Sequence, residues 1–108
     1  MYKQFIIISN LGINDKLLEN IDYLKIDKNF EFTSLYQLNV NNQIYDFDYL
    51  ITDIKINNLL ICEEDFIITN QYFESSIDNY FIIGKLNKSN ITIDEQIKII
   101  FDYINGNI

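Results

Sequence analysis

The residues best placed to do chemistry directly follow the apolar run Phe5–Ile8, where Ser9 offers a hydroxyl group and Gly12 permits a tight loop. Asn14 or Asp15 can then cap a helix. A strand, a short loop and a helix N-terminus form an anion site, because free backbone N–H groups point into the loop. The candidate phosphate-handling loop comprises Ser9, Asn10, Leu11, Gly12, Ile13, Asn14 and Asp15. The alternative is that this loop binds nothing, as is the case for most strand–loop–helix units.

A second candidate is the carboxylate of Asp53, which follows the apolar run Phe47–Thr52 at the expected end of a strand. A phospho-accepting aspartate of a receiver domain occupies such a position. A receiver also needs an acidic pair after its first strand to hold Mg²⁺, and this sequence has Ser9 and Asn10 there. The alternative is that Asp53 is simply a solvated residue at a strand end.

The composition excludes several classes of chemistry. The chain has no His and one Cys, which removes most metal sites and every mechanism that depends on histidine. We therefore expect no metal, no cofactor and no enzymatic activity. Cys62 follows two apolar residues, which indicates a buried thiol, and a lone cysteine fits a reducing compartment.

The charge balance bears on partners and location. Asp and Glu number 16 against 8 Lys, for a net charge of −8, so phosphate backbones and anionic membranes repel this chain. We expect no direct contact with nucleic acid. No apolar run is long enough to span a bilayer and no signal-peptide pattern is visible, so we expect a cytoplasmic location.

These groups depend on strands that hydrophobic patterning locates. Strands are expected at Gln4–Ile8, Phe30–Leu38, Phe47–Thr52 and Phe66–Thr69. An Asn-rich loop is expected at Asn39–Gln43. An irregular segment with a short helical turn or strand follows at Ile54–Cys62, and an acidic turn at Glu63–Asp65.

Helical spacing of apolar residues indicates three helices. The first is expected at about Asp15–Lys25. The second runs from Phe73 to Phe81, with a strand at Tyr80–Ile83 as the competing interpretation. The third begins at Thr92, which forms a capping box with Glu95, and ends at Asn105–Gly106.

Strands that alternate with helices predict a parallel sheet. The expected fold is a single α/β domain over residues 1–108, a small three-layer sandwich with about four parallel strands and helices on both faces. Function in such sheets lies at the carboxyl ends of the strands. That edge is expected to gather Ser9, Asn10, Asp53, Thr69 and Asn70.

Two stretches resemble a known family. They are similar to parts of the IIB components of the sugar phosphotransferase system, in the lactose/galactitol-like class. The first and third strands of that class, with their flanks, are matched here by Phe5-Ile6-Ile7-Ile8-Ser9-Asn10-Leu11-Gly12-Ile13-Asn14-Asp15-Lys16-Leu17-Leu18 and by Tyr45-Asp46-Phe47-Asp48-Tyr49-Leu50-Ile51-Thr52. The likeness covers the first half of the chain well and the second half loosely. Ser9 stands where the family has its phosphorylated cysteine, and Asn14 and Asp15 replace loop hydroxyl residues.

A IIB-like fold without its cysteine resembles the C-terminal domain of Mga/AtxA-type transcription regulators. The resemblance implies a catalytically silent regulatory and self-association domain, which pairs with a second copy, with other domains of its regulator or with phosphotransferase-system proteins. Exposed aromatics would supply the contact, together with the last helix and the acidic turn; the candidates are Tyr36, Tyr45, Tyr72 and Tyr80. The alternatives are a phosphocarrier that uses Ser9 or Cys62, and a receiver-like domain that uses Asp53.

Overall fold

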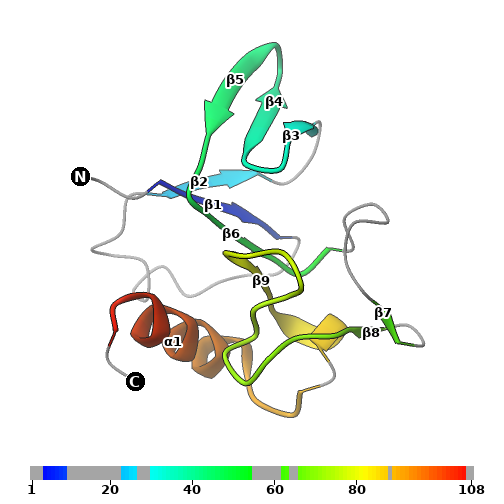
Figure 1. Ribbon diagram of the computed structural model, residues 1–108, viewed down its shortest axis with the longest axis vertical. Coiled ribbons are helices and arrows are strands. Elements are labelled where there is room, and N and C mark those ends of the chain that lie inside the picture. Colours follow the sequence, from blue (N-terminus) through cyan, green and yellow to red (C-terminus); the bar gives the residue numbers. More distant parts are fainter. Residues whose placement is uncertain are drawn as a thin grey trace.

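The structure is a computed structural model that describes residues 4–9, 23–26, 30–54, 62–63, 66–87 and 89–106, and every structural statement below concerns these residues (Figure 1). They form a central parallel sheet, a helix on one of its faces and a small antiparallel sheet on the other.

The central sheet holds four parallel strands in the order β2-β1-β6-β9. These are β1 (Phe5–Ile8), β2 (Tyr23–Ile26), β6 (Tyr49–Thr52) and β9 (Tyr80–Ile82). Strand β1 pairs with β2 on one side and with β6 on the other. Its four apolar side chains are all buried, as expected for a strand that is covered on both faces. The prediction of a buried first strand is therefore confirmed.

The helix α1 (Ile93–Ile104) covers one face of the central sheet. Its Ile97, Ile100 and Phe101 pack with Phe5 and Ile7 of β1, so that odd-numbered side chains of the strand meet the helix. The helix begins as predicted, because the Thr92 hydroxyl accepts the backbone N–H of Glu95 at 3.3 Å. The C-terminal helix and its cap are confirmed.

An antiparallel sheet covers the opposite face (Figure 1). It consists of β3 (Phe30–Ser34), β4 (Gln37–Val40) and β5 (Gln43–Asp46) in sequential order. Asn41 and Asn42 join β4 to β5 with φ values of 53° and 69°, the left-handed conformation that a two-residue hairpin turn requires. We call this three-stranded unit the meander.

Tyr80 joins the meander to the central sheet. It belongs to β9 and is fully buried, and its ring lies 5.8 Å from Tyr36 and 6.2 Å from both Phe32 and Phe47. Its hydroxyl donates a hydrogen bond to the carbonyl oxygen of Leu35, in the turn between β3 and β4. One side chain of the central sheet therefore holds the turn of the meander in place.

The loop between Asn70 and Asn79 is organised around a single carboxylate. Glu74 accepts hydrogen bonds from the Tyr103 hydroxyl at 3.1 Å and from the backbone N–H of Asn79 at 2.8 Å. The hydrogen bond to Glu74 raises the pKa of Tyr103, because ionisation would set two negative charges side by side. Tyr103 belongs to α1 and stacks on Tyr72 of the loop with ring centroids 4.3 Å apart, so this contact ties the loop to the helix.

The remaining elements are short. Strands β7 (Cys62–Glu63) and β8 (Phe66–Ile67) form a separate antiparallel pair, and η2 (Gly84–Asn87) is a single 3-10 turn after β9. The expected strand Phe66–Thr69 thus lies outside the central sheet. The predicted acidic turn begins within β7 at Glu63, and its other residues lie outside the described part of the chain.

The expected fold class is wrong, although the parallel sheet has four strands. Helices do not cover both faces: in the described part of the chain, the meander takes the place of a helical layer. The prediction failed because it makes Phe30–Leu38 one strand, although the alternation of apolar and polar residues breaks at Thr33-Ser34 and Leu35-Tyr36, where the chain turns. The segment instead turns at Leu35–Tyr36, and the expected loop Asn39–Gln43 contributes to β4, the turn and β5.

Two predicted helices also require correction. The first helix was expected at about Asp15–Lys25. Its last residues, Tyr23–Lys25, belong to β2, and its earlier residues lie outside the described part of the chain. The helix expected from Phe73 to Phe81 is a loop followed by β9, so the competing interpretation is confirmed. Phe73 and Asn79 adopt φ values of 65° and 67°, which no right-handed helix contains. Of the irregular segment Ile54–Cys62, only its first and last residues are described.

The buried phenol of Tyr80 predicts a loss of stability in alkali. Burial raises the pKa of Tyr80 from 10.0 to about 12, and the adjacent Tyr36 adds to the effect. The folded state therefore favours the neutral phenol, and this contribution is complete below pH 10 and declines as the pH rises towards 12. Replacing the tyrosine (Tyr80→Phe) removes the hydrogen bond at neutral pH, at a cost of about 1 kcal/mol, and removes this pH dependence.

Urea unfolding of both proteins, followed by circular dichroism over this alkaline range, measures the effect. The stability difference between wild type and Tyr80→Phe should shrink as the pH rises. A difference that stays constant would contradict the assignment of the pH dependence to Tyr80.

Candidate functional site

The candidate site lies at the carboxyl edge of the central sheet. The chain passes from β1 to β2 on one side and then returns to β6 and β9 on the other, so the strand order reverses between β1 and β6. Ligands of open α/β sheets bind outside the carboxyl ends of the strands at such a reversal. Here those two strands are followed by Ser9 and Asp53.

Ser9 and Asp53 form a hydrogen-bonded pair. The Ser9 hydroxyl donates to Oδ2 of Asp53 at 2.8 Å, and Ser9 is only 2% exposed. The backbone N–H of Asp53 donates to the carbonyl oxygen of Ile8 at 3.3 Å, which continues the pairing of β1 with β6 past the end of the strands. The carboxylate is therefore held beside the buried hydroxyl group.

This arrangement is poorly suited to nucleophilic chemistry at Ser9. A carboxylate can act as a general base towards a serine, but the hydroxyl group must also reach the substrate. Ser9 has almost no exposed surface, and an incoming phosphoryl group would meet the negative charge of Asp53. The pair serves instead to align the ends of β1 and β6.

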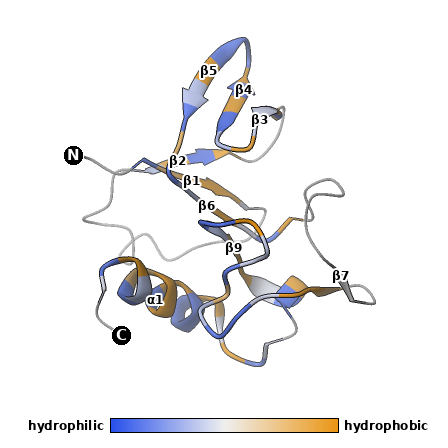
Figure 2. Ribbon diagram, viewed as in Figure 1, coloured by the Kyte–Doolittle hydropathy of each residue, from blue (hydrophilic) through white to orange (hydrophobic). Residues whose placement is uncertain are grey.

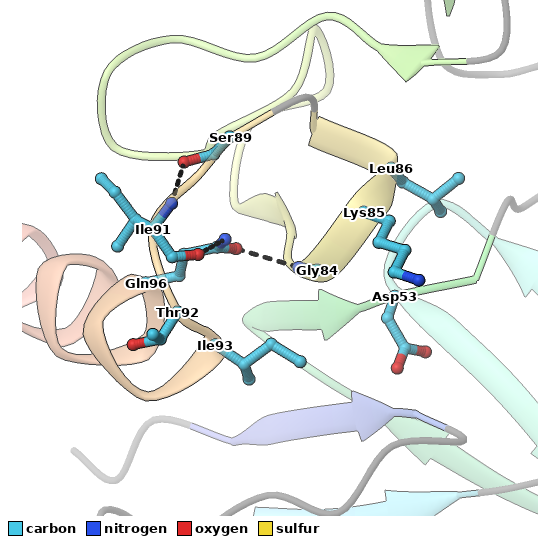
Figure 3. Close-up of a pocket in the computed structure, with 9 residues that line it drawn as sticks. All are labelled: Asp53, Gly84, Lys85, Leu86, Ser89, Ile91, Thr92, Ile93 and Gln96. Carbon is cyan, nitrogen blue, oxygen red and sulfur yellow. Dashed lines mark hydrogen bonds between the residues drawn. The ribbon is translucent and has the colours of Figure 1, made fainter.

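A pocket of about 570 Å³ opens next to this pair (Figure 3). It lies between the end of β6, the η2 turn and the beginning of α1. Its volume is within the range of small-molecule sites, roughly 300–1,000 Å³. The lining residues are Asp53, Gly84, Lys85, Leu86, Ser89, Ile91, Thr92, Ile93 and Gln96.

The buried side chain of Gln96 holds the walls of the pocket in place. Its Oε1 accepts the backbone N–H of Gly84 at 2.9 Å and Nδ2 of Asn87 at 2.7 Å, and its Nε2 donates to the carbonyl oxygen of Ile91 at 2.7 Å (Figure 3). Asn87 also donates to the carbonyl oxygen of Ile82, at the end of β9. Gly84 has a φ of 77°, a conformation that favours glycine. These hydrogen bonds join the residues that follow β9 to the first turns of α1.

The charges are distributed unevenly around the pocket. Lys85 and Asp53 lie at one end, near Leu86, and Ile91, Ser89 and Thr92 lie at the other (Figure 3). Two further carboxylates, Asp94 and Glu95, occupy the first turn of α1, where they oppose the binding of an anion at the helix N-terminus. The walls between these ends are mainly apolar.

The structure brings together only part of the predicted site. Ser9 and Asp53 meet as expected, whereas Asn10, Leu11, Gly12, Ile13, Asn14 and Asp15 lie outside the described residues. Thr69 and Asn70 do not end a strand of the central sheet, because β8 pairs with β7 and β9 takes the fourth position. They line a separate, smaller hollow of about 320 Å³.

Sequence reasoning missed the residues of the β9–α1 connection. The pattern does not single out Lys85, Leu86 and Ile91, because the preceding segment, Phe73 to Phe81, has the spacing of a helix. The apolar run Tyr80–Ile83 before Gly84 was the signal that could have located this edge, since it matches a buried strand followed by a turn.

Metal ligands and membrane spans give no further candidate. The described residues contain no cluster of three or more His, Cys, Asp or Glu side chains that could hold a metal ion. Among the same residues, no helix has the length and apolar character needed to cross a bilayer.

The role of Gln96 predicts a large effect of an isosteric apolar substitution. Gln96→Leu keeps the volume of the side chain but leaves the Gly84 N–H and the Ile91 carbonyl group without their partners, which should destabilise the fold by about 3 kcal/mol. Lys98→Leu, at an exposed position of the same helix, is the matched control and should change stability by less than about 0.5 kcal/mol. Urea unfolding of the two variants measures both; equal effects would refute the structural role of Gln96.

Comparison with known proteins identified no relative of this chain. No family model matches the sequence, and no match exists among the curated proteins or the solved structures. The resemblance to the IIB components is therefore carried by the residues quoted above.

Proposed function

We propose that this chain is a catalytically silent, IIB-like regulatory domain that acts through binding and self-association, in the manner of the C-terminal domain of Mga/AtxA-type transcription regulators. The observation that carries the proposal is the pairing of Ser9 with Asp53 at the end of β1. Where the IIB components carry a reactive cysteine, this chain has a buried hydroxyl group beside a carboxylate.

The electrostatics of this position support a silent site. A phosphocarrier needs a nucleophile that is both ionised and accessible, and a thiolate meets this need when surrounding N–H donors lower its pKa. A serine hydroxyl stays protonated without a general base that can deliver it to a substrate. Ser9 is 2% exposed and directs its proton to Asp53, so it offers neither ionisation nor access.

One experiment separates this proposal from the two phosphoryl-transfer alternatives. Incubation with the general phosphotransferase proteins tests Ser9 and Cys62 as acceptors, and incubation with acetyl phosphate and Mg²⁺ tests Asp53. Intact-mass spectrometry should show no added phosphate in either case. A phosphate on Ser9 or Cys62 would establish a phosphocarrier, a phosphate on Asp53 would establish a receiver-like domain, and either result would overturn the proposal.

The surface that suits self-association lies on the meander. Two of the four predicted contact aromatics do not form it: Tyr80 is fully buried, and the Tyr36 hydroxyl donates to the carbonyl oxygen of Asp78 at 2.6 Å. A third, Tyr45, belongs to β5 of the meander. Large apolar side chains are exposed elsewhere, and two of them belong to the meander: Leu35, in its first turn, is 46% exposed and Ile44, on β5, is 51% exposed.

Strand β5 can pair with the same strand of a second copy. Within the described part of the chain, β5 has a neighbouring strand on one side only, and an unpaired strand edge is a template for β-sheet extension. In a twofold-symmetric antiparallel pairing centred on this strand, Ile44 of each copy faces Tyr45 of the other and Asp46 faces Gln43. This register keeps the two Asp46 carboxylates from facing each other.

We expect sedimentation equilibrium to reveal a concentration-dependent dimer. The substitution Ile44→Asp places a charge in the pairing and should weaken the association by about tenfold or more. The matched control is Ile91→Asp, at a residue that is 44% exposed but lies on the opposite side of the central sheet, and it should leave the dimer intact. Because each copy carries a net charge of −8, added salt should strengthen the dimer.

Two results would count against this part of the proposal. A strict monomer at high micromolar concentration would exclude self-association and leave binding to another domain. A dimer that Ile44→Asp does not affect would show that the contact lies elsewhere.

A further inference from the structure

The last helix ends at a dipeptide that is chemically reactive in water. Asn105 closes α1, and Gly106 follows it with a φ of 74°, the left-handed conformation that favours glycine. This is the only Asn-Gly pair in the sequence. In such a pair the backbone nitrogen of the glycine can attack the side-chain amide of the asparagine, because glycine has no β-carbon to obstruct the approach. The pair is therefore a candidate for deamidation, the loss of the asparagine side-chain nitrogen as ammonia.

The reaction needs no co-reactant other than water. The nitrogen of Gly106 forms a bond to Cγ of Asn105, and the side-chain nitrogen of Asn105 leaves as ammonia with the proton of the attacking N–H. The product of this step is a cyclic imide, a succinimide. Water then opens the ring at either of its two carbonyl carbons. One product is aspartate, and the other is isoaspartate, in which the main chain runs through the former side-chain carbon.

Both residues of the pair are open to water. Asn105 and Gly106 are exposed, and a β-carbon placed on Gly106 would meet no heavy atom within 4 Å apart from its chain neighbours. The ring can therefore form without displacing a packed side chain. Asn41 and Asn42 in the turn of the meander are also exposed, but each is followed by a residue whose β-carbon obstructs the attack. They provide an internal comparison for the reactivity of Asn105.

The folded end of the helix holds the reacting atoms apart. Asn105 has a ψ of 0°, and ring closure requires ψ to rotate far from this value, so that Cβ of Asn105 eclipses the nitrogen of Gly106. The Gly106 N–H also donates to the carbonyl oxygen of Tyr103 at 3.1 Å, and the Asn105 N–H donates to that of Phe101 at 2.9 Å. The last turn of α1 must therefore open before the ring can close. Helix ends open locally at a lower free energy than the whole domain.

From this geometry we infer that Asn105 deamidates spontaneously, at a rate that the opening of the last turn of α1 controls. The reaction adds a carboxylate at the C-terminal end of the helix, where the macrodipole disfavours negative charge. Asp102 already lies in this turn, and no basic residue there offsets it. The reaction is irreversible, so each event leaves a less stable helix end. Tyr103 belongs to the same turn and donates to Glu74, so the modification also loosens the contact between α1 and the loop before β9.

Peptide mapping by mass spectrometry tests the inference on the folded chain, incubated in warm, mildly alkaline buffer. Asn105 should convert to aspartate and isoaspartate several-fold faster than Asn41 and Asn42 in the same sample. Isoaspartate is identified by an isoaspartate-specific methyltransferase, which transfers a methyl group to it from S-adenosylmethionine. Asn105→Gln should abolish the methyl transfer, because glutamine would have to close a larger ring, which forms far more slowly.

A second variant tests whether opening of the helix end controls the rate. Tyr103→Phe removes the hydrogen bond to Glu74 but keeps the ring that stacks on Tyr72, so the last turn should open more often and Asn105 should react about twofold to tenfold faster. Thr33→Val also removes one exposed hydroxyl hydrogen bond, to Gln37 in the meander, and is the matched control that should leave the rate unchanged. Unfolding the wild-type chain in urea should accelerate the reaction further.

Two results would overturn the inference. If Asn105 reacts no faster than Asn41 and Asn42, it is not a preferred site of modification. If Asn105 reacts at the same rate in the folded chain, in Tyr103→Phe and in urea, opening of the helix end does not control the reaction. Neither result depends on phosphoryl transfer or on the oligomeric state, so this test is independent of the proposed function.

Discussion

The burial of β1 on both faces is the constraint on which the rest of this structure depends. Its Ile6 and Ile8 project to one side and its Phe5 and Ile7 to the other, and none is more than 7% exposed. Each set needs an apolar cover. The helix α1 supplies one and the meander supplies the other. The colouring by hydropathy shows β1 as mainly apolar, whereas hydrophilic and apolar residues alternate along α1 and the meander (Figure 2).

The two covers achieve burial by different means. A twelve-residue helix presents a continuous apolar stripe, so α1 needs little beyond its own amphipathic sequence and its Thr92 cap. The meander has three short strands and packs through aromatic rings instead. Phe32, Tyr36 and Phe47 gather around Tyr80, which also makes the polar link to Leu35. The rings of Tyr36 and Tyr80 meet edge-to-face, a geometry that contributes beyond the area it buries, whereas Phe32 and Phe47 are tilted against Tyr80.

Those differences explain what could be predicted from the sequence. The first strand and the last helix obey local rules, a β-branched run and a capping residue with helical spacing, and both are found. The meander depends on Asn41 and Asn42 in left-handed conformations and on a turn at Leu35, where the only local signal is a break in the alternation of apolar and polar residues. The loop before β9 depends on Glu74 and its bond to Tyr103, a contact between distant parts of the chain that no local window contains.

The candidate site likewise has a part that could be predicted from the sequence and a part that could not. Ser9 and Asp53 were predictable because each follows a recognisable apolar run, and parallel strands bring their ends to one edge. Lys85 and Gln96 could not be predicted as site residues, because their positions depend on β9 being a strand and on hydrogen bonds between the residues that follow β9 and α1.

The strand order also dictates when the core can close during folding. Strand β1 is paired with β6, more than forty residues later in the chain, and β6 is paired in turn with β9, about thirty residues further on. The chain must therefore close two long loops before the central sheet is complete, and such non-local topologies fold slowly. On the ribosome, the apolar side chains of β1 that pack against Tyr80 on one face of the sheet and against α1 on the other would stay accessible until those later elements had been made. The nascent chain is exposed to chaperones and to aggregation for that interval.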